Sequence, residues 1–419
     1  MSVRIFHPMV APFVQQAARA LHEAGQLDSY ITSIRYAPDS TAQRALFAAG
    51  RLAGLDLERE FRRRTVTAVP LEKVISRPWG ELLRVATARA DRDGRLTDFV
   101  WERAEHAFDA AVARGLHPGL TGVYAFEYSS LATITRANAL GIRVAYDMPA
   151  PEPRFVQALL DREAAKFPEL VTPWHQWTAD REEGRIARRH AEFTRANLVV
   201  AASQFTRNSF APAGLDVSKV RVVPYGAPPV VDRELALSGG TTSGPLELVW
   251  AGTFSVRKGA HYLLDAWRTH RLGRHARLRV YGSVPLPDRI VQPVPEGIEF
   301  AGAVPHSELM AALHRADALI FPTLCDGFGM VVTEAWSRGV PVITTTSAGA
   351  ADLLRANENG LLIPAADADA IAQSVEWCVA HRAELRAMRE PALRTAAGWQ
   401  WSDYRARLVT VLREGGLFG

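Results

Sequence analysis

Cysteine is nearly absent from this chain, which has only Cys325 and Cys378 among its 419 residues. Two cysteines cannot build a disulfide framework, and these two form no C-x-x-C pair of the kind that binds zinc. The twelve histidines show no metal-ligand spacing either. We therefore expect neither a disulfide scaffold nor a metal site, and the natural location is a reducing cytoplasm.

Long apolar runs are also missing. No stretch approaches the roughly 18 consecutive apolar residues that a membrane-spanning helix needs. The chain begins MSVRIFHPMV, which has no charged segment followed by an apolar one, so we expect a first strand there and no signal peptide.

Lysine is scarce: only four of the 49 basic residues are lysines, and the net charge is +4. Such a surplus suits nucleotide phosphates, an anionic lipid surface or nucleic acid, and a general arginine bias explains it equally well. No nucleic-acid-binding motif is present, so we expect no nucleic acid partner. Residues 61–95 are rich in arginine, including RRR at 62–64, and predict peripheral contact with an anionic membrane.

Strands and helices alternate along the chain, which predicts parallel α/β sheets. The first half opens with a strand, a helix ended by Gly25 and a second strand, and residues 42–115 then have a mainly helical pattern. Further strands are expected at 122–126, 143–147, 197–202 and 221–224, with a long helical stretch at 154–196.

A compositional break at residues 226–245, rich in Gly, Pro, Ser and Thr, predicts a linker between a first domain (1–225) and a second (246–398). The second domain again alternates strands with helices, and a last helix is expected within 399–419. Two open α/β domains in tandem leave a cleft between the carboxyl ends of their strands, where ligands bind in such sheets.

The most informative segment is FPTLCDGFGMVVTEAWSRGVPVIT at 321–344. A strand ends there in a glycine loop that opens a helix, and free amides with the helix dipole favour an anion such as a diphosphate. Asp326 and Glu334 stand eight positions apart and can each accept hydrogen bonds from sugar hydroxyls. Each also has a plain structural explanation, Asp326 as a turn residue and Glu334 as an acid near a helix start. The amides expected to face the anion are those of Phe328, Gly329, Met330 and Val331.

A second segment, GTFSVRKG at 252–259, directly follows the strand ELVWA. Arg257 and Lys258 could neutralise a diphosphate leaving group at the same cleft. Two exposed charges at a helix start are the alternative explanation.

Together these segments resemble glycosyltransferase family 4, also called the group 1 glycosyltransferases. The similarity runs in order through GTFSVRKG, GIEFAGAVPHSEL, DGFGMVVTEAWSRGVPVI and ENGLLIP, over residues 246–395. It implies the GT-B fold, in which two Rossmann-like doubly wound domains face each other across a cleft. It also implies metal-independent, retaining transfer of a hexose from a nucleotide sugar to a saccharide or lipid-linked acceptor, without a cofactor, as in bacterial surface polysaccharide or glycoconjugate synthesis.

The resemblance also implies roles for single residues. Asp326 would contact the transferred sugar, Glu334 the ribose, and Lys258 with Arg257 the diphosphate. The tail, 399–419, would cross back to the first domain. The remaining donor-side residues would be Gly252, Thr253, Val304 and Pro305 (the last two at the base pocket), with Phe328, Gly329, Met330 and Val331.

The chain departs from the family pattern in several places. The first acid is Asp326 where glutamate is usual, and Thr253 stands where arginine is common. The loop after the first strand is HPMVAPF instead of a Gly-Gly loop. A histidine common on the acceptor side is absent, and Asp147 is the nearest polar group, so we take it as a catalytic candidate. His7 and Glu127 are candidates for the acceptor side.

Two other functions stay open at this point. A sugar-nucleotide epimerase or a glycosyl phosphorylase can use a similar two-domain cleft, although no cofactor lysine for a phosphorylase is recognisable. The departures at Thr253 and Asp326 also allow a catalytically weak homologue that acts as a binding protein.

Overall fold

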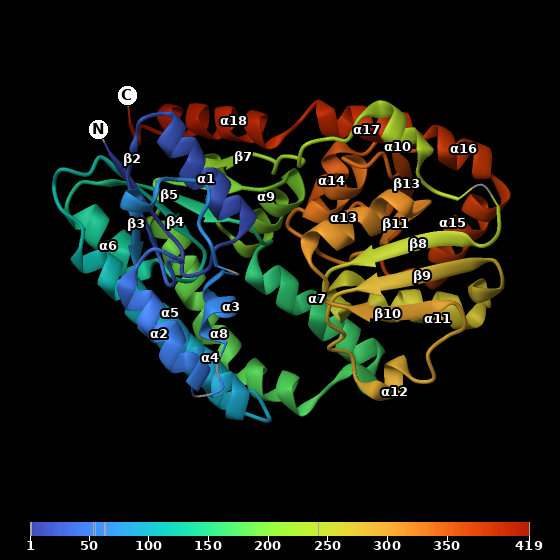
Figure 1. Cartoon of the computed structure of the whole chain (residues 1–419), viewed down its shortest axis with the longest axis horizontal. Helices are drawn as coiled ribbons and strands as arrows, with labels where there is room; N and C mark the ends of the chain where they lie inside the picture. The colour runs from blue at the N-terminus through green and yellow to red at the C-terminus, as the bar shows by residue number, and fades with distance from the viewer. Residues whose placement is uncertain (1, 53, 55, 63, 242, 419) are drawn as a thin grey trace.

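The computed structural model describes residues 2–52, 54, 56–62, 64–241 and 243–418. In this part of the chain, parallel strands form two sheets, one of seven strands and one of six. Figure 1 shows the sheets in two halves of an elongated molecule, each flanked by helices. The two-domain α/β prediction is confirmed.

The first sheet has the order β3-β2-β1-β4-β5-β6-β7, with β1 near its centre. Its central strands are buried along their whole length, because helices cover both faces of a parallel sheet. β3 is a short edge strand that the sequence pattern did not predict. The strands are β1 (Val3–Phe6), β2 (Leu27–Thr32), β3 (Val74–Ser76), β4 (Gly122–Phe126), β5 (Arg143–Met148), β6 (Leu198–Ala201) and β7 (Val220–Val222).

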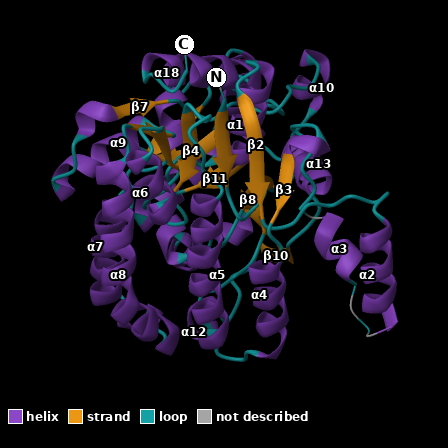
Figure 2. Ribbon diagram, turned by 90° about the vertical axis from the view of Figure 1, so that its left-hand side faces the viewer, coloured by secondary structure: helices purple, strands orange, loops and turns teal. Residues whose placement is uncertain are grey.

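The helices of this first domain pack around the sheet, except that α2 and α3 project away from it (Figure 2). The stretch 154–196, expected as mainly helical, forms two helices, α7 and α8, because Pro168 and Pro173 interrupt the hydrogen-bond ladder. The helices are α1 (Pro12–Glu23), α2 (Thr41–Leu52), α3 (Leu57–Arg62), α4 (Trp79–Ala90), α5 (Arg95–Arg114), α6 (Leu131–Ala139), α7 (Pro153–Lys166), α8 (Pro173–Arg195) and α9 (Gln204–Phe210).

The second sheet has the order β10-β9-β8-β11-β12-β13. Its core holds the fully buried side chains of Trp250 and Trp267. The strands are β8 (Leu246–Ala251), β9 (Ala276–Tyr281), β10 (Ile298–Gly302), β11 (Ala318–Phe321), β12 (Val342–Thr345) and β13 (Gly360–Ile363). The helices from the linker onward are α10 (Arg233–Ser238), α11 (Ala260–Thr269), α12 (Asp288–Val291), α13 (His306–Arg315), α14 (Met330–Trp336), α15 (Ala368–Ala380), α16 (Arg382–Ala387), α17 (Arg389–Ala397) and α18 (Trp401–Glu414).

The linker is more ordered than its composition predicts, because it contains the short helix α10. Ala236 of this helix is fully buried, and its carbonyl accepts a 2.8 Å hydrogen bond from the Arg389 guanidinium. Arg389 is itself 2% exposed and also donates to the carbonyl of Ala316. The linker is therefore fastened to the second domain.

The last helix, α18, lies against α1 of the first domain (Figure 1). Arg405 forms a 2.7 Å ion pair with Glu23 and donates a hydrogen bond to Gln16. Tyr404 of the same helix is fully buried. The chain thus ends on the domain in which it began.

Helix α7 and the turn after it connect the two domains. Glu163 Oε2 and His261 Nε2 of α11 share a 2.9 Å hydrogen bond, and Lys166 Nζ donates to the Tyr262 hydroxyl at 3.0 Å. Leu170 is buried in the core of the second domain. Figure 1 shows α7 between the two halves. A segment that follows a strand of the first sheet is therefore anchored on the second domain.

Candidate functional site

Lys258 and Asp326 meet at the carboxyl ends of two neighbouring strands of the second sheet. The 3-10 turn Val256–Lys258 follows β8, and the Asp326 loop follows β11. Lys258 Nζ lies 3.4 Å from Asp326 Oδ2, with both side chains largely buried. It also lies 5.0 Å from the ring centre of Phe321 and near Gly252, whose missing side chain leaves room for it. Two segments 68 residues apart in sequence thus place a cation and an acid side by side.

The backbone of the Asp326 loop is held by neighbouring loops. The Asp326 amide donates to Ser347 O at 2.9 Å, and its carbonyl accepts from the Gly349 amide at 3.0 Å. The Phe328 amide donates to the Asp326 carboxylate at 3.2 Å, so this amide is not free for an anion, contrary to the sequence prediction. Gly329 precedes α14 with φ 81°, a conformation that favours glycine.

The same loop touches the first domain at Gly327. Its carbonyl accepts hydrogen bonds from the Ser203 hydroxyl at 2.6 Å and the Thr206 hydroxyl at 3.1 Å. A side chain at Gly327 would lie 1.9 Å from the Pro149 carbonyl oxygen. Only glycine permits this approach of the two domains.

Glu334, one turn into α14, faces the start of α13. Its carboxylate accepts from His306 Nε2 at 3.1 Å, and this hydrogen bond raises the pKa of His306. His306 directly follows Val304 and Pro305, the residues predicted for a base pocket. Val304 is half-buried and Pro305 is exposed, so this corner of the second domain is open to a ligand.

The other predicted donor residues surround this corner. Thr253 is exposed in the loop after β8, and Met330 is half-buried at the start of α14. Phe328 and Val331 are buried, at 2% and 9% exposure, so they shape the loop from within.

A cavity of about 600 Å³, lined mostly by the first domain, reaches the second domain at Arg257, the residue before Lys258. His7 and Glu127, which follow β1 and β4, line it, and Arg257 reaches it from the second domain. Arg257 Nη1 also donates to Cys325 O at 3.4 Å, next to Asp326. Arg257 is therefore the residue that joins the acid–cation pair to the cavity.

Charge and burial differ between the two first-domain candidates. Burial lowers the pKa of His7 to about 4, so its imidazole is neutral at pH 7, and its Nδ1 is engaged by the backbone of Met9. Glu127 forms a 2.7 Å ion pair with Arg189 of α8, although burial raises the pKa of Glu127. The cavity thus has a neutral imidazole on one side and a paired acid on the other.

Asp147 lies in the core instead of facing this cavity. It is 1% exposed, and its Oδ2 accepts from the Tyr124 hydroxyl at 2.5 Å. Tyr225 and Tyr404 are buried around it, and burial raises the pKa of Asp147 to about 7. Its position supports a structural role, as a carboxyl group enclosed by tyrosines from three distant segments.

We expect Asp147→Asn to keep catalytic turnover within about threefold of the wild-type value. We also expect its free energy of unfolding, relative to that of the wild type, to increase as the pH rises. The folded protein holds the proton of Asp147 up to about pH 7, whereas the unfolded chain loses it near pH 4. The carboxyl therefore destabilises the fold progressively between pH 4 and 7, on the order of a few kcal/mol, and asparagine removes this cost. Urea unfolding at pH 4, 5.5 and 7 measures the difference. A hundredfold loss of turnover in a stably folded variant would instead make Asp147 catalytic.

Metal-binding side chains do not gather at this site. Among the described residues, no three His, Cys, Asp or Glu side chains come together in a way that could hold a metal ion.

Comparison with known proteins agrees with this geometry. A family profile described as "Glycosyl transferases group 1" matches residues 245–381, which hold the Lys258–Asp326 pair and Glu334. The second domain is therefore similar to the group 1 glycosyl transferases. The resemblance seen in the sequence motifs is confirmed.

Curated relatives of this domain match over part of their length. Glycogen synthase of Mycobacterium tuberculosis is 30% identical over 139 residues, which cover 32% of this chain and 34% of that protein. A GDP-mannose-dependent alpha-(1-6)-phosphatidylinositol monomannoside mannosyltransferase of the same species is 27% identical over 240 residues, covering 52% of this chain and 62% of that protein. The chain therefore spans about one to two thirds of the length of these relatives.

The structural likeness extends over both domains. Anabaena Alr3699/HepE, solved in complex with UDP, superposes with a TM-score of 0.58 at 14% identity, covering 99% of this chain and all of that one. At this identity the likeness shows the fold alone, and that fold is GT-B. The second domain thus sits in the two-domain architecture that the sequence predicted.

Several residues of this site were not recognised in the sequence. The Ser203 hydroxyl accepts from the Thr206 amide as the N-cap of α9, and it also donates to the Gly327 carbonyl of the second domain. His306 and Arg189 gave no sequence signal, because their partners Glu334 and Glu127 lie 28 and 62 positions away.

Proposed function

We propose that this chain is a retaining, metal-independent glycosyltransferase that moves a hexose from a nucleotide sugar to a saccharide or lipid-linked acceptor, in bacterial surface polysaccharide or glycoconjugate synthesis. The observation that carries the proposal is the Lys258–Asp326 pair, 3.4 Å apart at the strand ends, with Lys258 directly after Arg257, which lines the interdomain cavity. The similarity of the second domain to the group 1 glycosyl transferases supports it.

In this proposal each residue has a physical task. Lys258 and Arg257 neutralise the diphosphate as it leaves, and fixed charges of this kind cost no reorganisation during the reaction. Asp326 binds hydroxyls of the transferred sugar and compensates the positive charge that develops at its anomeric carbon. The acceptor hydroxyl lies in the cavity and attacks the anomeric carbon from the side that the diphosphate leaves, so that the anomeric configuration is kept. Its proton passes to the departing diphosphate as the bond from the anomeric carbon to the phosphate oxygen breaks.

Glu334 binds the ribose hydroxyls of the donor in this scheme. It does not line the cavity and lies beside His306, the residue that follows Val304 and Pro305 at the open corner. UDP is bound by Anabaena HepE and GDP-mannose is used by the mycobacterial relative, so both nucleotides are donor candidates.

Glu334→Ala is expected to raise the KM of the donor by about 10- to 100-fold, with a smaller change in kcat, because a carboxylate hydrogen bond to ribose is lost. The donor is first identified by thermal shift with UDP, GDP, ADP and their sugars, since a ligand of the folded state raises Tm. The pKa of His306, followed by NMR, should fall in the same variant because its hydrogen bond to Glu334 is gone.

Glu308→Ala is the matched control, since Glu308 is an exposed acid on α13 close in sequence to His306. Unchanged KM and kcat in Glu334→Ala would remove the assigned role. Donor turnover without any acceptor, yielding an epimerised nucleotide sugar, would favour the epimerase alternative.

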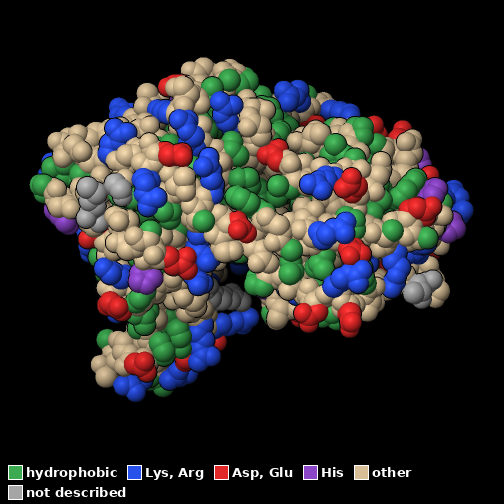
Figure 3. Space-filling model, turned by 90° about the horizontal axis from the view of Figure 1, so that it is seen from above, with side chains coloured by type: hydrophobic (Ala, Val, Ile, Leu, Met, Phe, Trp, Pro, Cys, Tyr) green, Lys and Arg blue, Asp and Glu red, His purple; other side chains and the backbone are tan. Residues whose placement is uncertain are grey.

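We further propose that the first domain rests on the cytoplasmic face of an anionic membrane. Figure 3 shows Lys and Arg side chains along a lobe that projects from the body of the molecule, and α2 and α3 are the projecting helices in Figure 2. No helix among the described residues combines the length and apolar character needed to cross a bilayer. Among the described residues from 41 to 95, the exposed arginines are Arg44, Arg51, Arg59, Arg62, Arg77, Arg89, Arg92 and Arg95.

Exposed apolar side chains accompany these arginines. Leu52 at the end of α2 is 93% exposed, and Trp79 and Leu83, one turn apart on α4, are 81% and 56% exposed. Trp beside Arg is typical of a surface that lies in the lipid headgroup region.

Replacing both Trp79 and Leu83 by serine is expected to weaken partition onto anionic liposomes by about tenfold or more, because both apolar groups leave the lipid interface. Flotation at low and moderate salt measures the bound fraction, and salt should weaken binding further by screening. Leu235→Ser is the control, since Leu235 is 47% exposed on α10, outside this region. Absence of cofloating wild-type protein at low salt would end the membrane proposal.

A further inference from the structure

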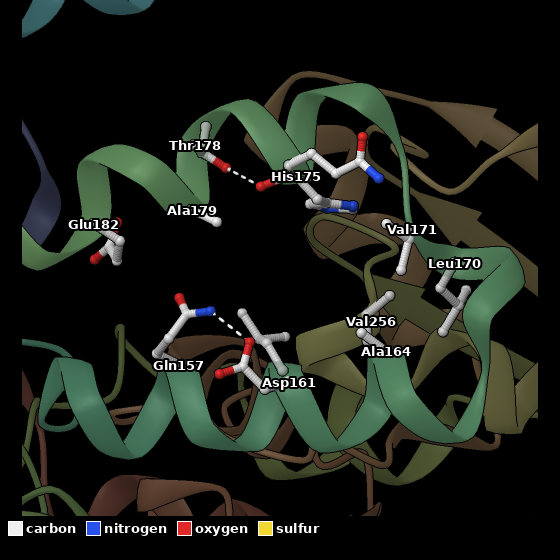
Figure 4. A pocket seen from close by; sticks show the side chains of 12 residues that line it. Gln157, Asp161, Ala164, Leu170, Val171, His175, Thr178, Ala179, Glu182 and Val256 are labelled. Atoms are coloured by element: carbon white, nitrogen blue, oxygen red, sulfur yellow. Dashed lines mark hydrogen bonds between the residues drawn. The ribbon is translucent and has the colours of Figure 1, made fainter.

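Helices α7 and α8 enclose a second pocket, of about 260 Å³, beside the main cavity (Figure 4). The two helices run side by side, and their facing side chains point into the space between them. The lining residues come from α7, α8, the turn between them and Val256 of the second domain.

The sequence places one stripe of each helix in this pocket. Gln157, Leu160 and Ala164 of α7 stand at helical spacing on one face, and Thr178 and Ala179 of α8 face them. Adjacent helices normally pack with their side chains interdigitated and without such space. These two helices remain apart over the length of the pocket, which leaves room for a ligand.

The pocket is continuous with the proposed reaction site. Gln157, Leu160 and Thr178 line both this pocket and the 600 Å³ cavity. Val256, at the second-domain end of the pocket, directly precedes Arg257, which lines the cavity. A ligand that occupies both spaces would therefore have one end near Arg257 and the other between α7 and α8.

The charged side chains that line the pocket favour a ligand group without charge. Its described lining residues include no arginine or lysine, while Asp161 and Glu182 are both acidic. Asp161 accepts a 2.8 Å hydrogen bond from the Gln157 amide, drawn as a dashed line in Figure 4. Glu182 is paired with Arg189 at 3.4 Å and His175 also lines the pocket, so Asp161 is the acid that disfavours a phosphate or carboxylate. An apolar group meets Leu160, Ala164 and their neighbours.

The walls of the pocket are attached to different domains. α7 is fastened to the second domain through the Glu163–His261 hydrogen bond. α8 is attached to the first domain, where its Arg189 pairs with Glu127. A group seated between the two helices thus contacts the acceptor side and the donor side at once.

We propose that the acceptor carries an uncharged apolar group next to the sugar that receives the hexose, and that this group binds between α7 and α8. An alkyl chain and an aromatic ring share the required chemistry. The inference rests on the proposed transferase function, because it assigns the adjoining cavity to the acceptor.

The test compares methyl, heptyl and 4-nitrophenyl glycosides of glucose, galactose and mannose, with binding measured by isothermal titration calorimetry below the micellar range of the heptyl compounds. We expect a heptyl or 4-nitrophenyl glycoside to bind at least tenfold tighter than the methyl glycoside of the same sugar. Ala164→Phe and Ala179→Phe fill the pocket from opposite walls and should each abolish this preference. Ala165→Phe is the control, because Ala165 is the exposed next residue of α7 and is not among the pocket's lining residues.

A preference for heptyl alone identifies an alkyl chain, and a preference for 4-nitrophenyl alone identifies a ring. Equal binding of all three glycosides of every sugar would overturn the inference, as would a preference that survives in both filled variants. Donor turnover is measured separately with nucleotide sugars. Its absence would count against the transferase, while the glycoside preference would still decide what the pocket binds.

Discussion

Replacing Lys258 by alanine should reduce glycosyl transfer by about 10²- to 10³-fold, with most of the loss in kcat. Its ammonium group lies 3.4 Å from Asp326 and 5.0 Å from the centre of the Phe321 ring, so the cation is fixed before the donor binds. Removing one preorganised charge that stabilises a leaving group has an effect of this size in other enzymes. Steady-state kinetics with the donor found by thermal shift measures it.

Lys73→Ala is the matched control for this variant. Lys73 lies at the edge of the first sheet, where its ammonium donates to the Leu27 carbonyl, and it should keep nearly full turnover. Asp326→Asn and the double variant complete a mutant cycle, which tests whether the two groups act as a unit. If Lys258→Ala stays folded and retains more than a third of wild-type kcat, the leaving-group role is wrong.

Gly327→Ala should lower both stability and turnover, because the new methyl group would lie 1.9 Å from the Pro149 carbonyl oxygen of the other domain. To avoid this steric clash, the two domains must move apart locally, which lengthens the hydrogen bonds from Ser203 and Thr206 to the Gly327 carbonyl. We expect a loss of about 1–3 kcal/mol in the free energy of unfolding and at least a tenfold loss in kcat/KM.

Thermal unfolding, small-angle scattering and kinetics together measure this effect. Gly184→Ala is the control, since a Cβ on this helical glycine meets no atom within 4 Å, and alanine there should stabilise the fold by about 0.5–1 kcal/mol. A Gly327→Ala variant with wild-type Tm and turnover would mean that the domains do not need this contact in the active form.

The second domain could be predicted from the sequence largely because its site residues lie on local motifs. The spacing of Gly252 and Lys258, and that of Asp326 and Glu334, is set by one strand–loop–helix unit each. Their meeting follows from a general property of parallel sheets, whose strand ends share one edge.

The rest depended on contacts between distant segments, which a local pattern does not contain. The three-residue strand β3 and the edge strand β13 were missed, because short edge strands show little periodicity. Asp147 looked like a catalytic acid at a strand end, and only the fold reveals Tyr124, Tyr225 and Tyr404 around it. The linker helix α10 escaped notice because its order comes from Arg389, about 150 residues later.

The return of the chain through α18 makes two covalent crossings between the domains, and they run next to each other. The Ala227 amide donates to the Trp399 carbonyl at 2.9 Å, and the Trp401 amide donates back to the Ala227 carbonyl. Two adjacent crossings define a hinge axis: the domains can rotate about the line that joins the crossings, while sliding or twisting of one domain against the other is resisted. Any domain opening that admits the donor should therefore be widest at the face opposite these crossings. A chain cut before Trp401 would lose one crossing, so its domains should no longer rotate about a single axis.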